Sequence, residues 1–580
     1  MYLSVQNRNG REYLSIQKGY WNRETKSRSS TTVMALGFAD TFLDKYDDPI
    51  AHFKQVAKEM TANEKAQRHV SVDINMDEEL PENAQGAYNF GYAVPMRVYH
   101  ALWLDDFFKR KMAGQKFEFN TNSIMIMLVM SRILSPGSKK RAFDGKGRYF
   151  ERFDFSLDDI YRALSHFAGI GTELQQSIYE RVRARYGSDT SIIYYDVTNY
   201  YFHISKPDEL RKYGRGKENR KKPVIQMGLA MDADGVPIHY KLFPGNTLDK
   251  QTFRSVIGDV RLKYDTGRIV VVADMGIITG DNIYYLTGGK KHKPLNGYVF
   301  SFSVRGGAAK FQEYVLDESG YADAGGKPAT AGSDFKVKSR LEARDISVTM
   351  GNGKKKTKQV YEKQVVFWNR KHFNKARAER AEVLAKAEAL IKNPGKFTKA
   401  TAYGAAAYVL NIDYDKKTGE VRENDGTALL LDEAKIAEEE LYDGYYAIVT
   451  SELHMSDSEI IDIYRGLWEI EETFKITKSD LAARPVYLQE YDHIDAHFLI
   501  CFISLVIIRL IQKETGKKHS AAAIIDALNK IECMHEFENI YLFGHRSRLS
   551  AELGKAFGID FSKKRLRLDE IKNILGEVKR

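Results

Sequence analysis

The spacing of hydrophobic and polar residues changes several times along the chain, and each change predicts a different kind of secondary structure. Residues 1–36 alternate in hydrophobicity on both sides of Asn9-Gly10, which predicts a β-hairpin with a tight turn. From about residue 50 to residue 187, apolar residues recur every three or four positions, which predicts helices at 124–133, 157–167 and 173–186. Ser156 stands where the cap of the second helix is expected.

A strand-rich pattern begins near residue 188. Residues 190–195 form a β-branched and aromatic run that leads into Asp196, and strands are predicted at 224–231 and 237–243, joined by a turn. A helix follows at 250–264, and the apolar strand at 268–273 leads into Asp274. This order predicts an α/β core with one acid at each of two central strands.

Residues 297–425 interrupt this α/β pattern. They contain alternating strands at 298–304 and 360–368, Gly-rich turns, a basic run at 354–358 and a charged helix at 374–391, which together predict a β-rich insertion. The α/β pattern resumes with a strand at 445–450. A helix is then predicted from Ser456, whose spacing to Glu459 is that of a capping box, to about residue 481. The tail from 521 to 580 is predicted to be helical and basic.

The helix predicted at 456–481 carries a third acid. Residues at three- and four-residue steps share one face of a helix, and here they are Tyr464, Leu467, Trp468, Glu471, Phe474, Lys475 and Lys478. A carboxylate on a buried face is costly unless it is paired or bound to a metal. We therefore expect Glu471 to face a cation, whereas Glu469 and Glu472 fall off this stripe and are expected to face solvent.

Asp196, Asp274 and Glu471 are the candidate metal ligands and catalytic residues. Oxygen ligands without His or Cys partners favour Mg²⁺ or Mn²⁺ over zinc. A site of three carboxylates can hold two such ions roughly 4 Å apart, which suits in-line displacement at a phosphodiester. His493 and His497 have the spacing of a zinc pair, but they lack the Glu and the third ligand of such a motif, so a structural role is expected.

Composition adds a substrate class and a compartment. The chain has 88 Lys and Arg against 78 Asp and Glu, an excess that favours a polyanionic partner such as DNA. Its two cysteines, Cys501 and Cys533, argue against a disulfide framework and fit a reducing compartment. The first residues lack the pattern of a signal peptide, and the apolar run at 498–508 is too short to span a bilayer. We expect a cytoplasmic, nucleoid-associated protein without a membrane partner.

Four segments resemble the DDE transposases of bacterial insertion sequences: YYDVTNYYF around Asp196, GLAMDADGVPIHYKLFPGNTLDKQTF after it, VVADMGI around Asp274, and the helix around Glu471. The resemblance covers about residues 190–500. More narrowly, the chain resembles the subgroup in which a β-rich domain is inserted between the second and third acids. That subgroup carries a motif of Tyr, two residues, Arg, three residues, Glu, six residues and Lys. Here Tyr464, Glu471 and Lys478 are in register, but Leu467 stands where Arg is expected.

The resemblance implies a ribonuclease H-like catalytic core interrupted by the β-rich insertion, with a mostly helical N-terminal region. It implies two Mg²⁺ or Mn²⁺ ions on the three acids, and double-stranded DNA as partner, both terminal inverted repeats and target DNA. It also implies a homodimer in the synaptic complex. Lys478, Lys475 and Tyr464 would contact phosphate, and the basic loop with Arg215, Arg220 and Lys221 is a further candidate.

The domain boundaries follow from these changes of pattern. They are a hairpin region at 1–50, a helical DNA-binding region at 51–187, a first core segment at 188–296, the insertion at 297–425, a second core segment at 426–515 and a helical tail at 516–580. Two other functions stay open. One is a nuclease on the same core that performs no strand transfer, and the other is a transposon-derived protein that binds DNA without catalysis.

Overall fold

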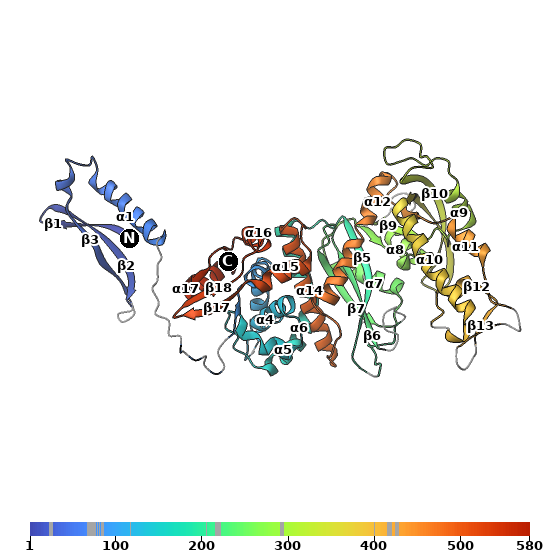
Figure 1. The fold of residues 1–580 in the computed structure, drawn as a ribbon, viewed down its shortest axis with the longest axis horizontal. Helices are drawn as coiled ribbons and strands as arrows, with labels where there is room; N and C mark the ends of the chain where they lie inside the picture. Colours follow the sequence, from blue (N-terminus) through green and yellow to red (C-terminus); the bar gives the residue numbers. More distant parts are fainter. Residues whose placement is uncertain are drawn as a thin grey trace. The chain divides into compact units, whose positions relative to one another are not determined.

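The computed structural model describes residues 1–22, 27–66, 86–115, 118–204, 206–214, 222–289, 295–398, 401–414, 420–423 and 428–580, together with 77, 79 and 82. The chain divides into two compact units, Met1–Ala84 and Gln85–Arg580 (Figure 1).

The N-terminal unit is a three-stranded antiparallel sheet with one long helix. Its strands β1 Tyr2–Arg8, β2 Arg11–Asn22 and β3 Ser27–Phe38 lie in chain order. Asn9 and Gly10 both have positive φ (52° and 82°), as the tight hairpin turn requires. Helix α1 Pro49–Ala66 contacts β1 and β2, and Leu14, Ile16, Phe53 and Ala57 are buried. The predicted hairpin is confirmed, and the structure adds the third strand.

The second unit is built on one mixed sheet of eight strands. In spatial order these are β10 Phe335–Thr349, β11 Lys355–Asn369, β16 Tyr445–Thr450, β9 Gly297–Phe302, β8 Val270–Ala273, β5 Ile192–Tyr201, β6 Val224–Met231 and β7 Pro237–Pro244. Strands β5, β8 and β9 are parallel to one another, and every other pairing is antiparallel. Their β-branched and aromatic residues favour strands that are buried on both faces. This sheet is consistent with a ribonuclease H-like core.

The two faces of the sheet pack against different helices. On one face, Tyr195, Val271 and Phe300 join a core with helices α7 Asp249–Lys263 and α8 Gly280–Thr287. On the other face, Tyr194 and Val272 join the main core. Because successive side chains of a strand point to opposite faces, Asp196 lies on the same face as Tyr194.

The main core centres on α14 Tyr491–Glu514, which contacts β7 and the helices α4 and α6 (Figure 1). The apolar run at 498–508 was judged too short to span a bilayer, but it lies in this longer helix, which is long and apolar enough to do so. The apolar stretch of α14 is 94% buried inside the protein, as expected for a core helix. The helices of the same region are α2 Ala93–Ala101, α3 Leu104–Met112, α4 Thr121–Leu134, α5 Lys139–Asp144 and α6 Leu157–Tyr186. The two helices predicted at 157–167 and 173–186 are one continuous helix, and Ser156 caps it as expected.

The segment predicted as a β-rich insertion is joined closely to the main sheet. Its first strand, β9, lies between β8 and β16, and the long hairpin β10–β11 pairs with β16. Outside the main sheet, this segment contains the helices α9 Ala309–Leu316 and α10 Arg370–Lys392. Two pairs of short strands follow: β12 Val409–Leu410 pairs with β15 Leu430–Leu431, and β13 Ile412–Tyr414 pairs with β14 Val421–Glu423. Helix α11 Glu433–Glu440 comes after them. A small separate core lies under α10 and these short strands.

The C-terminal region differs from its prediction as an all-helical tail. Helices α15 Ala521–Lys530, α16 Arg548–Phe557 and α17 Leu568–Val578 are interleaved with three strands, β17 Glu532–Phe537, β18 Ile540–Phe543 and β19 Arg565–Arg567. These strands form a four-stranded sheet with β4 Tyr88–Asn89, which lies more than 400 residues earlier in the chain. The prediction was wrong because short strands with a distant partner carry little local signal.

Candidate active site

Asp196 lies in β5, on the face of the sheet that packs against the main core. Its carboxyl group is half-buried. Burial raises the pKa of Asp196 to about 7, and the negative charges of Asp274, Asp249 and Glu471 act in the same direction, while a hydrogen bond from the Val197 backbone opposes them. The carboxyl of Asp196 is therefore within electrostatic range of both other candidate acids.

Asp274 follows β8 directly, and the strand register places it beside Asp196. Strands β5 and β8 are parallel neighbours in which Tyr194 is aligned with Val272. Asp196 and Asp274 each lie two residues further along, so both acids point to the same face of adjacent strands. Ser301, on the other neighbouring strand β9, donates a hydrogen bond of 2.8 Å to the Asp274 carboxylate. Register alone therefore brings the first two acids together.

The third acid, Glu471, lies on a helix that is interrupted. The predicted helix at 456–481 is divided into α12 Asp457–Arg465, α13 Trp468–Lys475 and a π-helical turn, Ile476–Asp480. The capping box of Ser456 and Glu459 is confirmed. The expected stripe does not share one buried face: Trp468 is 56% exposed and Glu471 is exposed, whereas Leu467 and Phe474 are buried.

Gly466 explains how α12 and α13 approach the strand that carries Asp196. A Cβ atom at Gly466 would lie 2.0 Å from the Tyr194 hydroxyl, so no larger residue fits without a shift. The same hydroxyl donates a hydrogen bond of 3.1 Å to the backbone carbonyl of Ile463 in α12. Tyr194 and Asp196 share one strand face, and Tyr194 therefore fixes the helix pair next to the acids.

Glu469 and Glu472 do not face solvent as predicted. Glu469 is buried, and the buried Arg509 of α14 forms ion pairs of 3.3 Å with both carboxylates. Arg509 also donates hydrogen bonds to the Glu469 carbonyl (2.7 Å) and to Thr473 Oγ1 (3.0 Å). The prediction was wrong because helical periodicity cannot reveal a cation from a helix that follows later in the chain. Arg509 thus anchors α13 through contacts with residues before and after Glu471.

Tyr464 lies close enough to two of the acids for their charges to affect its pKa. Burial raises the pKa of Tyr464 to about 12; a hydrogen bond with Ser301 lowers it, and the charges of Asp274 and Glu471 raise it further. Among the residues that the structure describes, no Lys, Arg or His forms an ion pair with Asp196, Asp274 or Glu471. Within the same residues, no three His, Cys, Asp or Glu side chains are close enough to hold one ion together. Asp196, Asp274 and Glu471 are therefore not gathered around one point in this structure. As carboxylates without a protein cation among the described residues, they have the chemistry of ligands for hard divalent ions.

Comparison with known proteins identifies the family. The model of the transposase DDE domain matches residues 187–507, more than half of the chain, and this range contains all three acids. The chain belongs to the DDE transposase family. No curated protein sequence matches it.

Two solved structures show distant similarity to this DDE transposase. One is the Mos1 transposase paired-end complex with the left transposon end, 12% identical, with 38% of this chain and 60% of that chain covered and a TM-score of 0.11. The other is the Mos1 mariner paired-end complex with Mn, 11% identical, with 41% and 66% covered and a TM-score of 0.11. This chain thus spans less than two thirds of the first Mos1 chain.

Of the candidate DNA-contacting residues of the DDE domain, only some lie in the part of the chain that the structure describes. Arg215, Arg220 and Lys221 lie outside the described residues. Lys475 is exposed, and Lys478 lies in the π-helical turn with its ammonium 5.9 Å from the Tyr200 ring centroid. These two lysines follow Glu471 within seven residues, on the same segment as the third acid.

Leu467 replaces the expected Arg at a position that faces the protein interior. It is buried and belongs to the main core. Arg465, the nearest arginine, pairs instead with Asp462 at 3.1 Å. An apolar residue at position 467 is therefore explained by packing, and α13 takes its ionic anchor from Arg509.

A cleft of about 370 Å³ opens beside Asp274 of the DDE domain, and sequence reasoning missed it. Asp274, Ser301 and Tyr464 lie on one side, while His372 of α10 and Tyr446 of β16 contribute aromatic rings whose centroids are 4.6 Å apart. Arg305 and Lys375 add positive charge. No local motif could have found these residues, because they come from elements that are distant in sequence.

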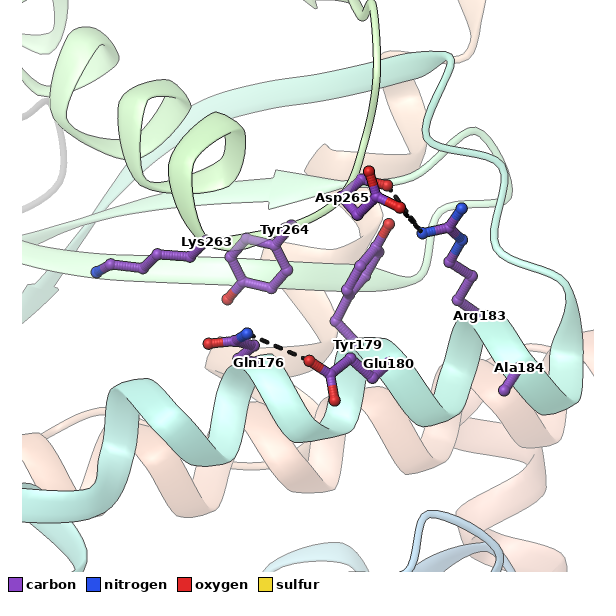
Figure 2. Close-up of a pocket in the computed structure, with 8 residues that line it drawn as sticks. All are labelled: Gln176, Tyr179, Glu180, Arg183, Ala184, Lys263, Tyr264 and Asp265. Carbon is purple, nitrogen blue, oxygen red and sulfur yellow. Dashed lines mark hydrogen bonds and ion pairs between the residues drawn. The ribbon is translucent and has the colours of Figure 1, made fainter.

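A second pocket, of about 490 Å³, lies between α6 and the end of α7 and shares no residue with the three acids (Figure 2). Figure 2 shows two pairs among its polar groups: Arg183 donates to Asp265, and Gln176 donates to Glu180 at 3.2 Å. The rings of Tyr179 and Tyr264 pack edge to face at 4.9 Å.

The turn that follows Lys478 is held by a buried basic cluster. Arg132 donates to the carbonyls of Leu481 and Ala482 at 3.2 and 3.3 Å. His497 Nε2 lies 3.1 Å from the Ala483 carbonyl, and its Nδ1 lies 3.0 Å from the Lys139 ammonium. The structural role expected for His497 is thus confirmed. Burial lowers the pKa of Lys139 to about 7, with help from the positive charge of Arg132.

Proposed function

We propose that this DDE transposase cleaves DNA at the ends of its own mobile element and joins those ends to target DNA. The observation that carries the proposal is the alignment of Asp196 and Asp274 on adjacent parallel strands, with the charge of Glu471 acting on Asp196. Membership of the DDE family supports the same reading. Terminal inverted repeats and target DNA are the proposed partners, within the cytoplasm and in a homodimeric synaptic complex.

Asp196, Asp274 and Glu471 would hold two Mg²⁺ or Mn²⁺ ions. Such ions lower the pKa of an attacking water or 3′-hydroxyl and stabilise the leaving oxygen. The protein's own role is to fix the carboxylates. Ser301 orients the Asp274 carboxylate, and Arg509 anchors the turns of α13 around Glu471.

Charged residues around the acids would position the DNA backbone. We propose that Lys475, Lys478 and Tyr464 contact phosphates next to the scissile bond, and that Arg215, Arg220 and Lys221 contact phosphates further along the duplex. The support for the first group is its position on the segment of Glu471. Phosphate contacts fix the register of a duplex, and positioning of the scissile bond is a large contribution to catalysis in phosphoryl transfer.

The test is a metal-dependent nicking assay on a duplex that carries the DNA flanking the coding region. Asp196→Asn, Asp274→Asn and Glu471→Gln should each abolish Mg²⁺-dependent nicking, while binding of the duplex survives. Glu438→Gln, at an exposed position of α11, is the matched control and should nick at the wild-type rate. Nicking at a near wild-type rate in any of the first three variants would show that its acid is misassigned.

A second assay separates transposition from the alternatives. Pre-cut element ends are incubated with a target plasmid and Mg²⁺, and joined products are scored. A nuclease on the same core would cut the flanking duplex and yield no joined product. A transposon-derived protein without catalysis would bind the duplex and do neither, although all three acids are present in this chain.

A further inference from the structure

The sheet of the N-terminal unit has one covered face and one open face. Leu14 and Ile16 of β2 are fully buried on the face that α1 contacts. In the antiparallel pairing of β1 with β2, Tyr2 is opposite Gln17, Gln6 is opposite Tyr13, and Arg8 is opposite Arg11. Directly opposed residues point to the same side. The other side, which we name the open face, is shared by Tyr2, Ser4, Gln6, Arg8, Arg11, Tyr13, Ser15 and Gln17, of which Ser15 is buried.

Contacts among these side chains confirm that they share one surface. The Arg8 guanidinium lies 4.0 Å from the Tyr13 ring centroid and donates to Gln6 at 3.2 Å. Tyr2 donates its hydroxyl hydrogen to Gln17 at 3.0 Å. Gln6 and Arg8 are exposed. The open face is thus a row of amide, guanidinium and phenol groups on a rigid sheet.

Charge is divided unevenly between the two sides of this unit. The described strand residues 1–22 and 27–38 contain four basic residues and one acid, and of these Glu12 and Lys18 occupy positions in β2 that alternate with the open face. The segment 39–66, which includes α1, contains four lysines and six acids. Asp40 of this segment pairs with Arg11 at 2.6 Å and leaves Arg8 as the cation that projects from the hairpin end. The sheet side is therefore suited to a polyanion, and the helix side is not.

We propose that the open face binds the major groove of the terminal-repeat DNA and reads base edges through Gln6 and Arg8. The major groove admits a β-ribbon, and there Gln pairs with adenine and Arg with guanine through two hydrogen bonds each. The side chains of both residues point the same way from one strand, two positions apart. The inference rests on the proposed function, and it moves repeat recognition from the helical region at 51–187 to the sheet at 2–38.

The experiment measures binding of the full chain to two labelled duplexes by fluorescence anisotropy, without divalent metal. One duplex carries the terminal repeat that flanks the coding region, and the other carries the same bases in shuffled order. The double variant Gln6→Ala/Arg8→Ala should bind the repeat at least tenfold more weakly and the shuffled duplex within threefold of wild type. Arg8→Lys, which keeps the charge and loses the two-pronged donor, should lose some of the discrimination.

Lys18→Ala is the matched control, because it removes one positive charge from β2 at a position that alternates with the open face. It should bind both duplexes within threefold of wild type. The proposal is overturned if the folded double variant still prefers the repeat as strongly as wild type. It is also overturned if Arg8→Ala weakens both duplexes equally with a smaller salt dependence, since that result marks a phosphate contact. Equal binding of both duplexes by the wild-type chain would instead refute the proposed function.

Discussion

Replacement of Arg509 tests whether its ion pairs and hydrogen bonds to α13 hold the third acid, Glu471, in place. Arg509→Met keeps the length and apolar stem of the side chain but removes the guanidinium. The Glu469 carboxylate then stays buried, with the partly exposed Lys517 at 3.2 Å as its remaining cation. Breaking a buried ion pair from one side costs about 3–5 kcal/mol, and a net hydrogen bond contributes about 1 kcal/mol. Because Lys517 compensates to some extent, we expect a loss of about 4 kcal/mol in the free energy of unfolding.

The same substitution should affect catalysis beyond its effect on stability. Glu471 lies between Glu469 and Glu472, the two residues that Arg509 holds, so loss of the guanidinium frees the helix turn that carries the acid. We expect at least a tenfold slower single-turnover nicking by folded Arg509→Met, together with a higher Mg²⁺ concentration for half-maximal rate. Arg509→Lys should fall between this variant and wild type, since one ammonium cannot serve both carboxylates and Thr473.

The assays are urea unfolding followed by tryptophan fluorescence and nicking over a Mg²⁺ titration. A double variant, Glu469→Gln/Arg509→Met, provides the control: it removes the uncompensated charge and should recover more than 1 kcal/mol of stability. The Mg²⁺ concentration for half-maximal rate should stay higher than in wild type in that double variant, because α13 still lacks the ion pairs with Arg509. A loss of stability below about 1 kcal/mol in Arg509→Met, or a nicking rate and Mg²⁺ requirement equal to wild type, would refute the reasoning.

Two further predictions concern packing and pH. Gly466→Ala should destabilise the protein by about 1–3 kcal/mol in urea unfolding, because its Cβ would lie 2.0 Å from the buried Tyr194 hydroxyl. The control is Gly576→Ala, at a position of α17 with open space around it, and it should be neutral or stabilising. Lys139 has a folded-state pKa of about 7 against 10.5 in the unfolded chain, so the unfolded state binds more protons between these values and stability rises with pH there, by up to about 1.4 kcal/mol per pH unit. Lys139→Met should lack this rise between pH 7.5 and 9.5, and an unchanged pH profile of the unfolding midpoint would show that Lys139 is not held neutral.

Local sequence pattern was sufficient for the strands that define the core. Strands at 224–231 and 445–450 were predicted with the bounds that the structure has, and Asp274 follows a strand as predicted. The strand predicted at 190–195 was too short, because β5 runs from Ile192 to Tyr201 and Asp196 lies within it and not at its end. Such runs carry their own signal, because apolar and β-branched residues favour a strand that is buried on both faces. The order of these elements then implied which strands carry the acids.

The same local pattern could not predict contacts between residues that are distant in the sequence. Nothing near Glu469 indicates Arg509, which lies 40 residues later on α14, and nothing near Tyr88 indicates its pairing with Cys533. The need for glycine at position 466 comes from the Tyr194 ring, on a strand 272 residues earlier. These features are set by long-range contacts, and helical periodicity therefore misassigned the exposed and buried acids of α13.

One strand, β5, sets the geometry of the whole site. It places Asp196 through its register with β8, and it places α12 through the hydrogen bond from Tyr194, two residues earlier on the same face. Arg509 then fixes α13 from the opposite side. The third acid is thus positioned by contacts on both sides of its helix, while its own carboxylate stays exposed and free of protein cations among the described residues. At the proposed metal site, a carboxylate held in this way would lose little freedom when a divalent ion binds, which is the physical advantage of a helix that is already fixed in place.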